Sequence, residues 1–194
     1  MADEPVTILG ISGSLRSGSF NSALLRAAIE LAPAGARIET ASIKGIPLYD
    51  GDVEAASGVP AIVTELKERI VQADGVLLVT PEYNNSIPGV FKNAIDWLSR
   101  PPADIPRVFG DLPVALIGAS PGRGGTILSQ AAWLPVLRTL RTHPWLGGRL
   151  QVAQAGQVFD AQGKLVDQRI REELVRFMQG FAAFARGASR RRRG

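Results

Sequence analysis

Short apolar segments alternate along this chain with segments that have the spacing of amphipathic helices. The clearest apolar segments, residues 6–11, 75–80 and 113–119, are continuous runs, which is typical of strands buried on both faces. The other expected strands are residues 38–43 and 151–158. The expected helices are residues 21–31, 61–73, 90–98, 126–140 and 167–184. This order predicts an α/β protein with a doubly wound, five-stranded parallel sheet and helices on both faces.

The length of 194 residues indicates a single domain, and no repeat or internal linker divides it. We expect this domain to comprise residues 1–187. Residues 190–193 are four consecutive arginines, and the rest of the chain holds equal numbers of basic and acidic residues. We therefore expect residues 188–194 to form a disordered basic tail, with no nucleic-acid partner. Residues 45–60, rich in Gly, Pro and Asp, are expected to be a long loop, and Pro135 is expected to kink or interrupt its helix.

The composition excludes several kinds of site. The chain has no cysteine and a single histidine, His143, so a thiolate nucleophile is excluded and a Ser-His-Asp triad or His-rich metal site is hard to build. We expect His143 to be a turn residue. Asp50, Asp52 and Glu54 lack the further ligands of a calcium loop, so no metal site is expected. No apolar run approaches the roughly 20 residues of a membrane span, and the N-terminus does not resemble a signal peptide. A cytoplasmic protein without a membrane partner is expected.

Polar loops follow three of the expected strands. The first polar loop (residues 12–21) is rich in Ser and Gly. The second polar loop (residues 81–86) reads Pro-Glu-Tyr-Asn-Asn-Ser, and the third polar loop (residues 120–125) reads Ser-Pro-Gly-Arg-Gly-Gly. Ligands of doubly wound sheets bind beyond the carboxyl ends of the strands, where all three loops emerge. We therefore expect these loops to line one pocket.

The first polar loop has the composition of an anion site. Ser14, Ser17 and Ser19 supply hydroxyl groups, Arg16 a guanidinium group and Asn21 an amide. The expected helix after the loop adds the positive end of its dipole. The lysine-containing loop of ATPases and the G-x-G-x-x-G dinucleotide fingerprint are both absent from this turn. A terminal phosphate group fits this set of donors.

Structural explanations stay open for each loop taken alone. The first polar loop is also compatible with a Ser/Gly-rich turn and a helix N-cap. In the second polar loop, Glu82 would be only a charge near the N-terminus of the next helix, and Asn84 or Ser86 would be only its cap. Tyr83 would belong to the core. The glycines of the third loop would be simple turn residues. The joint position of the loops at three strand ends favours a bound ligand.

Three motifs of the chain closely resemble those of the NADPH-dependent FMN reductase family. They read Gly13-Ser-Leu-Arg-Ser-Gly-Ser-Phe-Asn21, Pro81-Glu-Tyr-Asn84 and Pro88-Gly-Val-Phe-Lys-Asn-Ala-Ile-Asp-Trp97. The resemblance extends from about residue 6 to residue 120 and is most specific in the first two motifs. The family includes bacterial quinone and chromate reductases. The resemblance implies a single flavodoxin-like domain.

The resemblance also implies which residues bind FMN. The phosphate group is expected to contact the first polar loop through Ser14, Arg16, Ser19, Phe20 and Asn21. The flavin ring is expected to contact the other two loops through Pro81, Glu82, Tyr83, Asn84, Ser120 and Gly122. No side chain is expected to act as acid or base, because the flavin is the reagent.

By the same resemblance, the chain is expected to be an FMN-dependent NAD(P)H oxidoreductase. NADPH or NADH would pass a hydride to FMN and leave, and a quinone, flavin, chromate or similar acceptor would then use the same face in ping-pong turnover. Arg100 and Arg123 are candidates for the dinucleotide phosphates, and a homodimer or homotetramer is implied. Two other classes stay open: a flavodoxin-like electron carrier or flavin-binding module that oxidises no nicotinamide, and a hydrolase or nucleotide-binding module that uses the Ser-rich loop.

Overall fold

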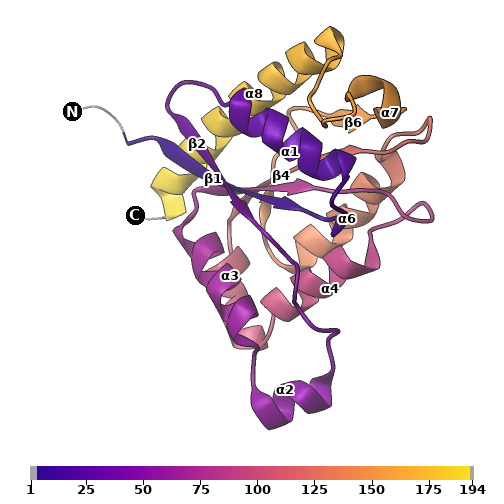
Figure 1. The fold of residues 1–194 in the computed structure, drawn as a ribbon. Coiled ribbons are helices and arrows are strands. Elements are labelled where there is room, and N and C mark those ends of the chain that lie inside the picture. Colours follow the sequence, from indigo (N-terminus) through magenta and orange to yellow (C-terminus); the bar gives the residue numbers. More distant parts are fainter. Residues whose placement is uncertain (1–3, 193–194) are drawn as a thin grey trace.

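The computed structural model describes residues 4–192, with side chains as far as residue 188. Its strands and helices alternate as the sequence predicts (Figure 1). In chain order they are β1 (Val6–Ser12), α1 (Phe20–Glu30), β2 (Ala36–Ala41), α2 (Gly51–Ser57), α3 (Ala61–Gln72), β3 (Gly75–Val79), α4 (Gly89–Leu98), the 3₁₀ turn η1 (Pro102–Asp104), α5 (Ile105–Phe109), β4 (Pro113–Ala119), α6 (Ile127–Thr139), β5 (His143–Pro144), β6 (Leu150–Val152), α7 (Ala155–Val158) and α8 (Gln168–Arg192).

The strands form one sheet in the order β2-β1-β3-β4, and β5 and β6 both pair with β4 at the far edge. All of these pairings are parallel. The chain leaves β1 toward one edge to form β2 and then returns to form β3 on the other side of β1. The order therefore reverses between β1 and β3, which is the switch point of flavodoxin-like sheets. The predicted fold class is confirmed.

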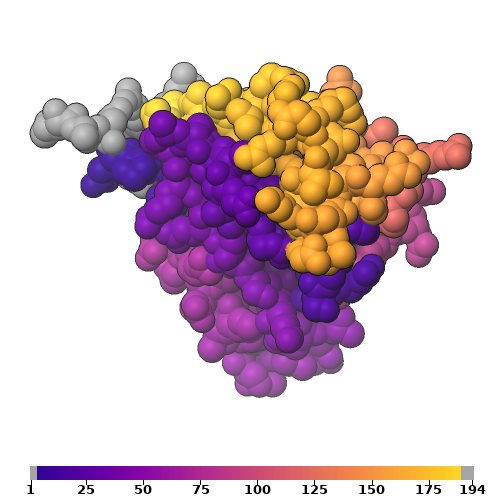
Figure 2. Space-filling model, turned by 45° about the horizontal axis from the view of Figure 1, so that its top comes forward, coloured from indigo at the N-terminus to yellow at the C-terminus, as the bar shows by residue number. Residues whose placement is uncertain are grey.

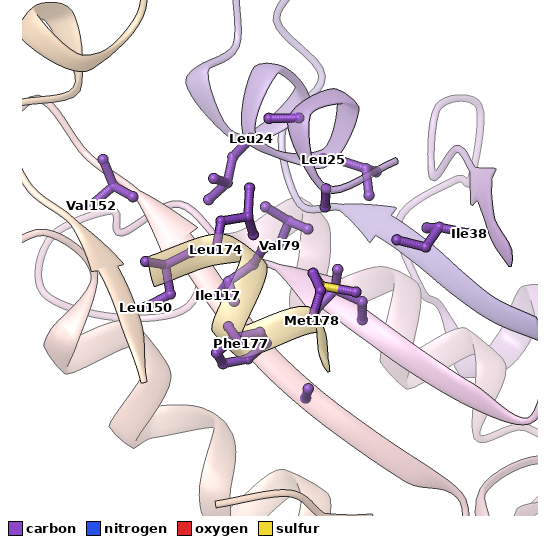
Figure 3. Packing of buried hydrophobic residues seen from close by; sticks show 14 of the residues in the cluster. Leu24, Leu25, Ile38, Val79, Ile117, Leu150, Val152, Leu174, Phe177 and Met178 are labelled. Atoms are coloured by element: carbon purple, nitrogen blue, oxygen red, sulfur yellow. The ribbon is translucent and has the colours of Figure 1, made fainter. Parts of the chain in front are cut away.

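Helices cover both faces of the sheet and produce two apolar clusters. On one face, α1 and α8 pack against alternate residues of the strands, including Ile8, Val79 and Ile117 (Figure 3). On the other face, α3, α4 and α6 pack against the residues between them, including Leu9 and Leu78. Burial on both faces explains why the central strands are continuous apolar runs.

The last strand differs from the prediction for residues 151–158. β5 pairs with the first half of β4, and β6 pairs with the second half, so residues 146–149 leave the sheet between them. β6 ends at Val152, because Gln154 adopts a left-handed conformation (φ 49°) and residues 155–158 form α7. His143 lies in β5, edge-on to Phe184 with ring centroids 4.7 Å apart, and is not a turn residue.

The segment at residues 45–60 is not simply a loop, since it contains α2, which projects away from the sheet (Figure 1). Asp50 caps this helix by accepting a hydrogen bond from the Asp52 N–H at 2.9 Å. Asn93 Nδ2 and Trp97 Nε1 of α4 both donate to the Pro47 carbonyl. The segment is therefore held against α4.

Two helices differ from what the sequence indicated. α6 continues through Pro135, which therefore does not start a new segment. α8 continues to Arg192, so residue 187 does not mark a structural boundary; of the expected tail, residues 193 and 194 lie outside the described residues. No helix in the described part of the chain is long and apolar enough to cross a bilayer. The cytoplasmic location stays a prediction.

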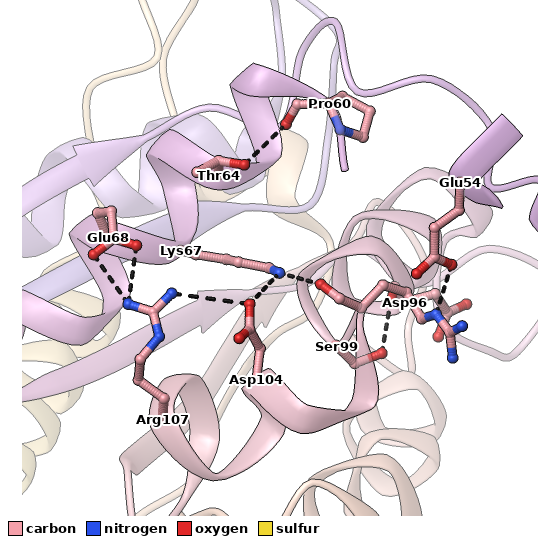
Figure 4. A network of polar contacts seen from close by, with 10 residues as sticks. Glu54, Pro60, Thr64, Lys67, Glu68, Asp96, Ser99, Asp104 and Arg107 are labelled. Carbon is pink, nitrogen blue, oxygen red and sulfur yellow. Dashed lines mark hydrogen bonds and ion pairs between the residues drawn. The ribbon is translucent and has the colours of Figure 1, made fainter. Parts of the chain in front are cut away.

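Lys67 organises the connection between α4 and α5 (Figure 4). Its ammonium group donates to the Arg100 carbonyl and to Asp104 Oδ2, the latter at 2.9 Å, and its side chain is only 3% exposed. The hydrogen bond from Lys67 lowers the pKa of the Asp104 carboxyl below its ordinary value. Arg107 pairs with Glu68 on the exposed side of this network.

We expect Asp104→Asn to lower the free energy of unfolding by about 1–2 kcal/mol at neutral pH, because Lys67 then keeps only neutral acceptors. The pKa of Asp104 is depressed in the folded state, so its contribution is present above the ordinary carboxyl pKa and is lost as the pH falls through the folded value. The difference from the wild type should therefore shrink below about pH 4. Thermal melts across pH measure it, with Glu68→Gln as an exposed control of small effect. A difference that persists to pH 2 contradicts this account.

Candidate functional site

A cleft at the carboxyl edge of the sheet brings residues of all three polar loops together. All of the cofactor residues predicted from the sequence line it except Asn84 and Gly122, and the structure adds Ala119 and Pro121, which the sequence did not indicate. The lining residues are Ser14, Arg16, Ser19, Phe20, Asn21, Pro81, Glu82, Tyr83, Ala119, Ser120 and Pro121. The cleft lies at the switch point between β1 and β3, where doubly wound sheets bind ligands.

The first polar loop offers a group of unpaired backbone donors. Among the described residues, no acceptor lies within hydrogen-bonding geometry of the N–H groups of residues 14, 15 and 17–21. Unpaired backbone donors are rare in folded proteins unless water or a ligand accepts from them. These groups precede and open α1, whose dipole adds positive potential. The loop is therefore suited to an anion.

The fold fixes this loop tightly at its ends. The Gly13 N–H donates to the Val79 carbonyl at 2.9 Å, and a Cβ on Gly13 would lie 2.1 Å from the Phe91 ring. Only glycine therefore fits between β1 and α4. Ser19 caps α1 by accepting from the Ser22 N–H at 3.2 Å. Between these anchors the loop is exposed, and it lies against the segment around α7 (Figure 2).

Asn21 has an unexpected partner. Its amide makes two hydrogen bonds of 2.9 Å with the backbone of Ala119, at the end of β4, and only 3% of the residue is exposed. The sequence had assigned Asn21 to the phosphate group. The structure instead engages its side chain with β4, and its backbone N–H has no acceptor in the described part of the chain.

The second polar loop contains a tight turn. Tyr83 and Ser86 exchange two backbone hydrogen bonds of 3.1 and 3.0 Å, and Asn84 and Asn85 between them both have positive φ, 49° and 61°. Asparagine tolerates this conformation better than most residues, which explains the Asn-Asn pair. Asn84 therefore lies at the tip of the turn, outside the cleft. Tyr83 is 45% exposed and lines the cleft, so it is not a core residue.

Glu82 connects the second polar loop to α6. One of its carboxylate oxygens accepts from the Leu128 and Ser129 N–H groups, at 2.8 and 2.9 Å, so Glu82 caps α6 from a distant part of the chain. A carboxylate at a helix N-terminus is stabilised by the dipole and by these donors. Thr126, directly before α6, makes no side-chain cap.

A buried hydroxyl network lies beneath Glu82. Thr80 Oγ1 contacts the Pro81 carbonyl at 2.9 Å, Ser129 Oγ at 2.9 Å and Trp133 Nε1 at 3.1 Å. The indole only donates and the carbonyl only accepts, so the single hydrogen of Thr80 goes to Pro81, and Ser129 donates to Thr80. The start of the second polar loop is therefore fixed to α6 at two points.

The third polar loop is held against β6 and α7. The Ser120 N–H donates to the Val152 carbonyl at 2.9 Å, and the Gln154 N–H donates to the Gly122 carbonyl at 3.0 Å. Ser120 Oγ accepts from the Gly122 N–H at 3.1 Å, which closes a local turn. Gly122 thus supports the loop from outside the cleft, and Arg123 at its tip is exposed.

Arg100, a candidate for dinucleotide phosphates, is already paired. Its Nε donates to Glu54 Oε2 at 2.7 Å, and its guanidinium group lies 5.8 Å from the centre of the Tyr49 ring. The hydrogen bond with Glu54 raises the pKa of Arg100, and the same bond lowers the pKa of Glu54. The hydroxyl of Tyr49 donates to Glu54, which raises the pKa of Tyr49. Arg100 therefore connects α2 to the end of α4 through Glu54.

No group of His, Asp or Glu side chains among the described residues is arranged to hold a metal ion. The residues that the sequence placed in the cleft were recognisable by their type and by their position after strands. Ala119 and Pro121 carried no such signal, because one contributes backbone groups and the other a plain apolar surface.

Comparisons with known proteins agree on one family. The sequence profile of the NADPH-dependent FMN reductase family matches residues 6–157. An NAD(P)H-dependent FMN reductase of Pseudomonas aeruginosa is 47% identical over 186 residues, covering 96% of this chain and 98% of the relative. A quinone reductase of Escherichia coli is 38% identical over 187 residues, covering 93% of this chain and 96% of the relative. The solved structure of FerB, an NAD(P)H:acceptor oxidoreductase of Paracoccus denitrificans, superimposes with a TM-score of 0.81 at 34% identity, covering 94% of this chain and 98% of FerB.

Proposed function

The chain belongs to the NADPH-dependent FMN reductase family and is an FMN-dependent NAD(P)H oxidoreductase, and we propose that its electron acceptor is a quinone or a similar small molecule. The predicted family, enzyme class and cofactors are confirmed. Relatives that match almost the whole chain and are named as reductases favour this reading over an electron carrier or a hydrolase.

The unpaired N–H groups of the first polar loop carry the proposed cofactor site. The FMN phosphate has several oxygens and nearly two negative charges, so it requires many donors from different directions. The loop supplies them from residues 14, 15 and 17–21, together with the exposed guanidinium group of Arg16. We assign the phosphate to Ser14, Arg16, Ser19 and the N–H groups of Phe20 and Asn21.

The flavin ring is assigned to the other side of the cleft. Pro81, Glu82, Tyr83 and Ser120 line it there, and the Glu82 N–H has no acceptor among the described residues. When bound, FMN supplies the redox chemistry by taking electrons from a reduced nicotinamide and passing them to an acceptor. The protein orients the ring and leaves one face accessible. Asn84 and Gly122 are left out of this assignment because they lie outside the cleft.

We also propose that a second copy of the chain covers an exposed apolar surface on α6 and the loop after β5. Ile127, Leu128 and Leu134 on α6 are 41–50% exposed, and Leu146 is 73% exposed. Ile127, Leu134 and Leu146 line one shared hollow. A continuous exposed apolar patch of this kind is typical of an interface, which fits the homodimer or homotetramer expected from the sequence.

One experiment tests the proposed function directly. The purified protein should be yellow, with flavin absorbance, and anaerobic NADPH should bleach it. Addition of a quinone should restore the colour, and steady-state NADPH oxidation should require the quinone. A colourless protein that takes up no FMN, or a yellow one that NADPH does not bleach, overturns the proposal.

Arg16→Ala should weaken FMN binding by about 10- to 100-fold, because a charge-assisted hydrogen bond contributes about 1.5–3 kcal/mol. Turnover at saturating FMN should change much less. Fluorescence titration of the apoprotein with FMN measures the dissociation constant. Arg37→Ala, at an exposed arginine paired with Glu39 on β2, is the matched control. Unchanged FMN affinity in Arg16→Ala contradicts the assignment.

Tyr83→Ala should change the KM values for NADPH and quinone together, by about threefold or more, since an aromatic side chain gives both substrates a broad, stiff surface. Tyr83→Phe keeps this surface and should stay close to the wild type. Steady-state kinetics and a thermal melt are measured on one preparation. Because Tyr83 is 45% exposed, its loss should leave the melting temperature nearly unchanged. A large loss of stability with normal KM values contradicts this role.

Leu134→Glu should shift the protein toward the monomer, because a charge in an apolar interface must be desolvated. Analytical ultracentrifugation measures the shift. Val166→Glu, at a position that is 57% exposed before α8, is the control and should not change the assembly. An unchanged oligomer in both variants would place the interface elsewhere.

A further inference from the structure

The hydrogen-bonded ladder between β3 and β4 ends one step before the cleft. Its register pairs Val79 with Ile117, and the Thr80 N–H donates to the Ile117 carbonyl at 2.8 Å. One more step of a parallel ladder would join Ala119 to the backbone on either side of residue 81. Residue 81 is a proline, and the chain turns away there into the second polar loop. Ala119 therefore has no strand partner on this side.

The Asn21 side chain occupies the vacant position. Its Oδ1 accepts from the Ala119 N–H and its Nδ2 donates to the Ala119 carbonyl, both at 2.9 Å. The two partners fix the orientation of the amide, because the N–H only donates and the carbonyl only accepts. Both residues are buried, so either backbone group would be costly to leave unpaired. Asn21 thus completes the end of β4 from a position 98 residues away.

This arrangement leaves a donor free in the second polar loop. In a continued ladder the Glu82 N–H would donate to the Ala119 carbonyl, which Asn21 now occupies. No acceptor among the described residues takes the Glu82 N–H, and Glu82 lines the cleft. Asn21 is also the last residue of the first polar loop and lies in the first turn of α1. One side chain therefore joins the end of the first polar loop to Ala119, directly before the third polar loop, next to the Glu82 N–H of the second, which is unpaired among the described residues.

We propose that Asn21 is a positioning residue for flavin binding. Its amide takes the place of the missing β3 partner at Ala119, and so holds the donors of the first polar loop and the Glu82 N–H around one ligand. This inference rests on the proposed function. It differs from a direct side-chain contact with the phosphate, because a positioning role affects the ring side of the cleft as well.

The choice of flavin separates the two roles. Riboflavin lacks the phosphate group, so a residue that contacts only the phosphate has no effect on riboflavin affinity. Asn21→Ala should weaken the binding of FMN and of riboflavin by similar factors, each about tenfold, because both Ala119 groups lose their partners. Arg16→Ala should weaken FMN alone. A loss confined to FMN in Asn21→Ala overturns the proposal.

Asn21→Asp gives a second test that does not depend on the alanine variant being stable. The ionised carboxylate accepts from the Ala119 N–H but faces the Ala119 carbonyl without a donor. The protonated carboxyl both donates and accepts, as the amide does. The riboflavin affinity of Asn21→Asp should therefore be lower than that of the wild type at about pH 7, and should recover toward the wild-type value measured at the same pH as the pH is lowered to about 5, toward the range in which a buried carboxyl takes up a proton. Absence of this recovery counts against the proposal.

Gln130→Ala is the matched structural control. Gln130 is also a buried amide, and it donates to the Leu150 carbonyl of β6 at 2.9 Å, but it does not line the cleft. Its loss should lower the melting temperature by a similar amount and leave both flavin affinities unchanged. Equal losses of flavin affinity in Gln130→Ala and Asn21→Ala would show a general effect of stability and overturn the proposal. A wild-type protein that binds neither flavin would instead overturn the proposed function.

Discussion

A parallel sheet depends on backbone hydrogen bonds that must stop at its carboxyl edge, and the way in which they stop determines this site. Within the sheet, each strand pairs its N–H and carbonyl groups with its neighbours. Where β1, β3 and β4 end, the connections diverge to opposite faces and the pairing cannot continue. The remaining backbone groups must find other partners or stay available to a ligand. Both outcomes occur within a few residues of each other.

Several polar side chains at this edge hydrogen-bond to backbone groups of the protein and stabilise the fold around the cleft. Asn21 completes the end of β4, Glu82 caps α6, and Ser19 caps α1. These residues have the chemistry of ligand-binding groups, and a reading of the sequence assigns them to the cofactor. The contacts of Asn21 and Glu82 hold segments that are distant in the sequence against one another, and the contact of Ser19 stabilises the start of α1. The donors that stay free are mostly backbone N–H groups, which no residue type in the sequence reveals.

The sequence was sufficient for the architecture and for the location of the cleft that the polar loops line. Continuous apolar runs gave the central strands, and polar residues after three of them marked the cleft. The Asn84-Asn85 pair also carried a readable turn signal, since both residues adopt positive φ. The pairing of Asn21 with Ala119 was not predictable, because it depends on the residue at which the chain after β3 turns away from β4. The split between β5 and β6 and the helix α2 were missed because short elements depend on tertiary contacts more than on their own periodicity.

The two helices that begin beside the cleft differ in a way that favours one orientation of the proposed FMN. α6 presents its first N–H groups to Glu82, so its positive end is neutralised from within the protein. α1 is capped by Ser19 at one N–H only, and the N–H groups of Phe20 and Asn21 stay unpaired among the described residues. A phosphate group is therefore attracted to α1 and not to α6. With the phosphate at α1, the ring of the proposed FMN extends toward the second and third polar loops, where Tyr83 and the free N–H of Glu82 lie.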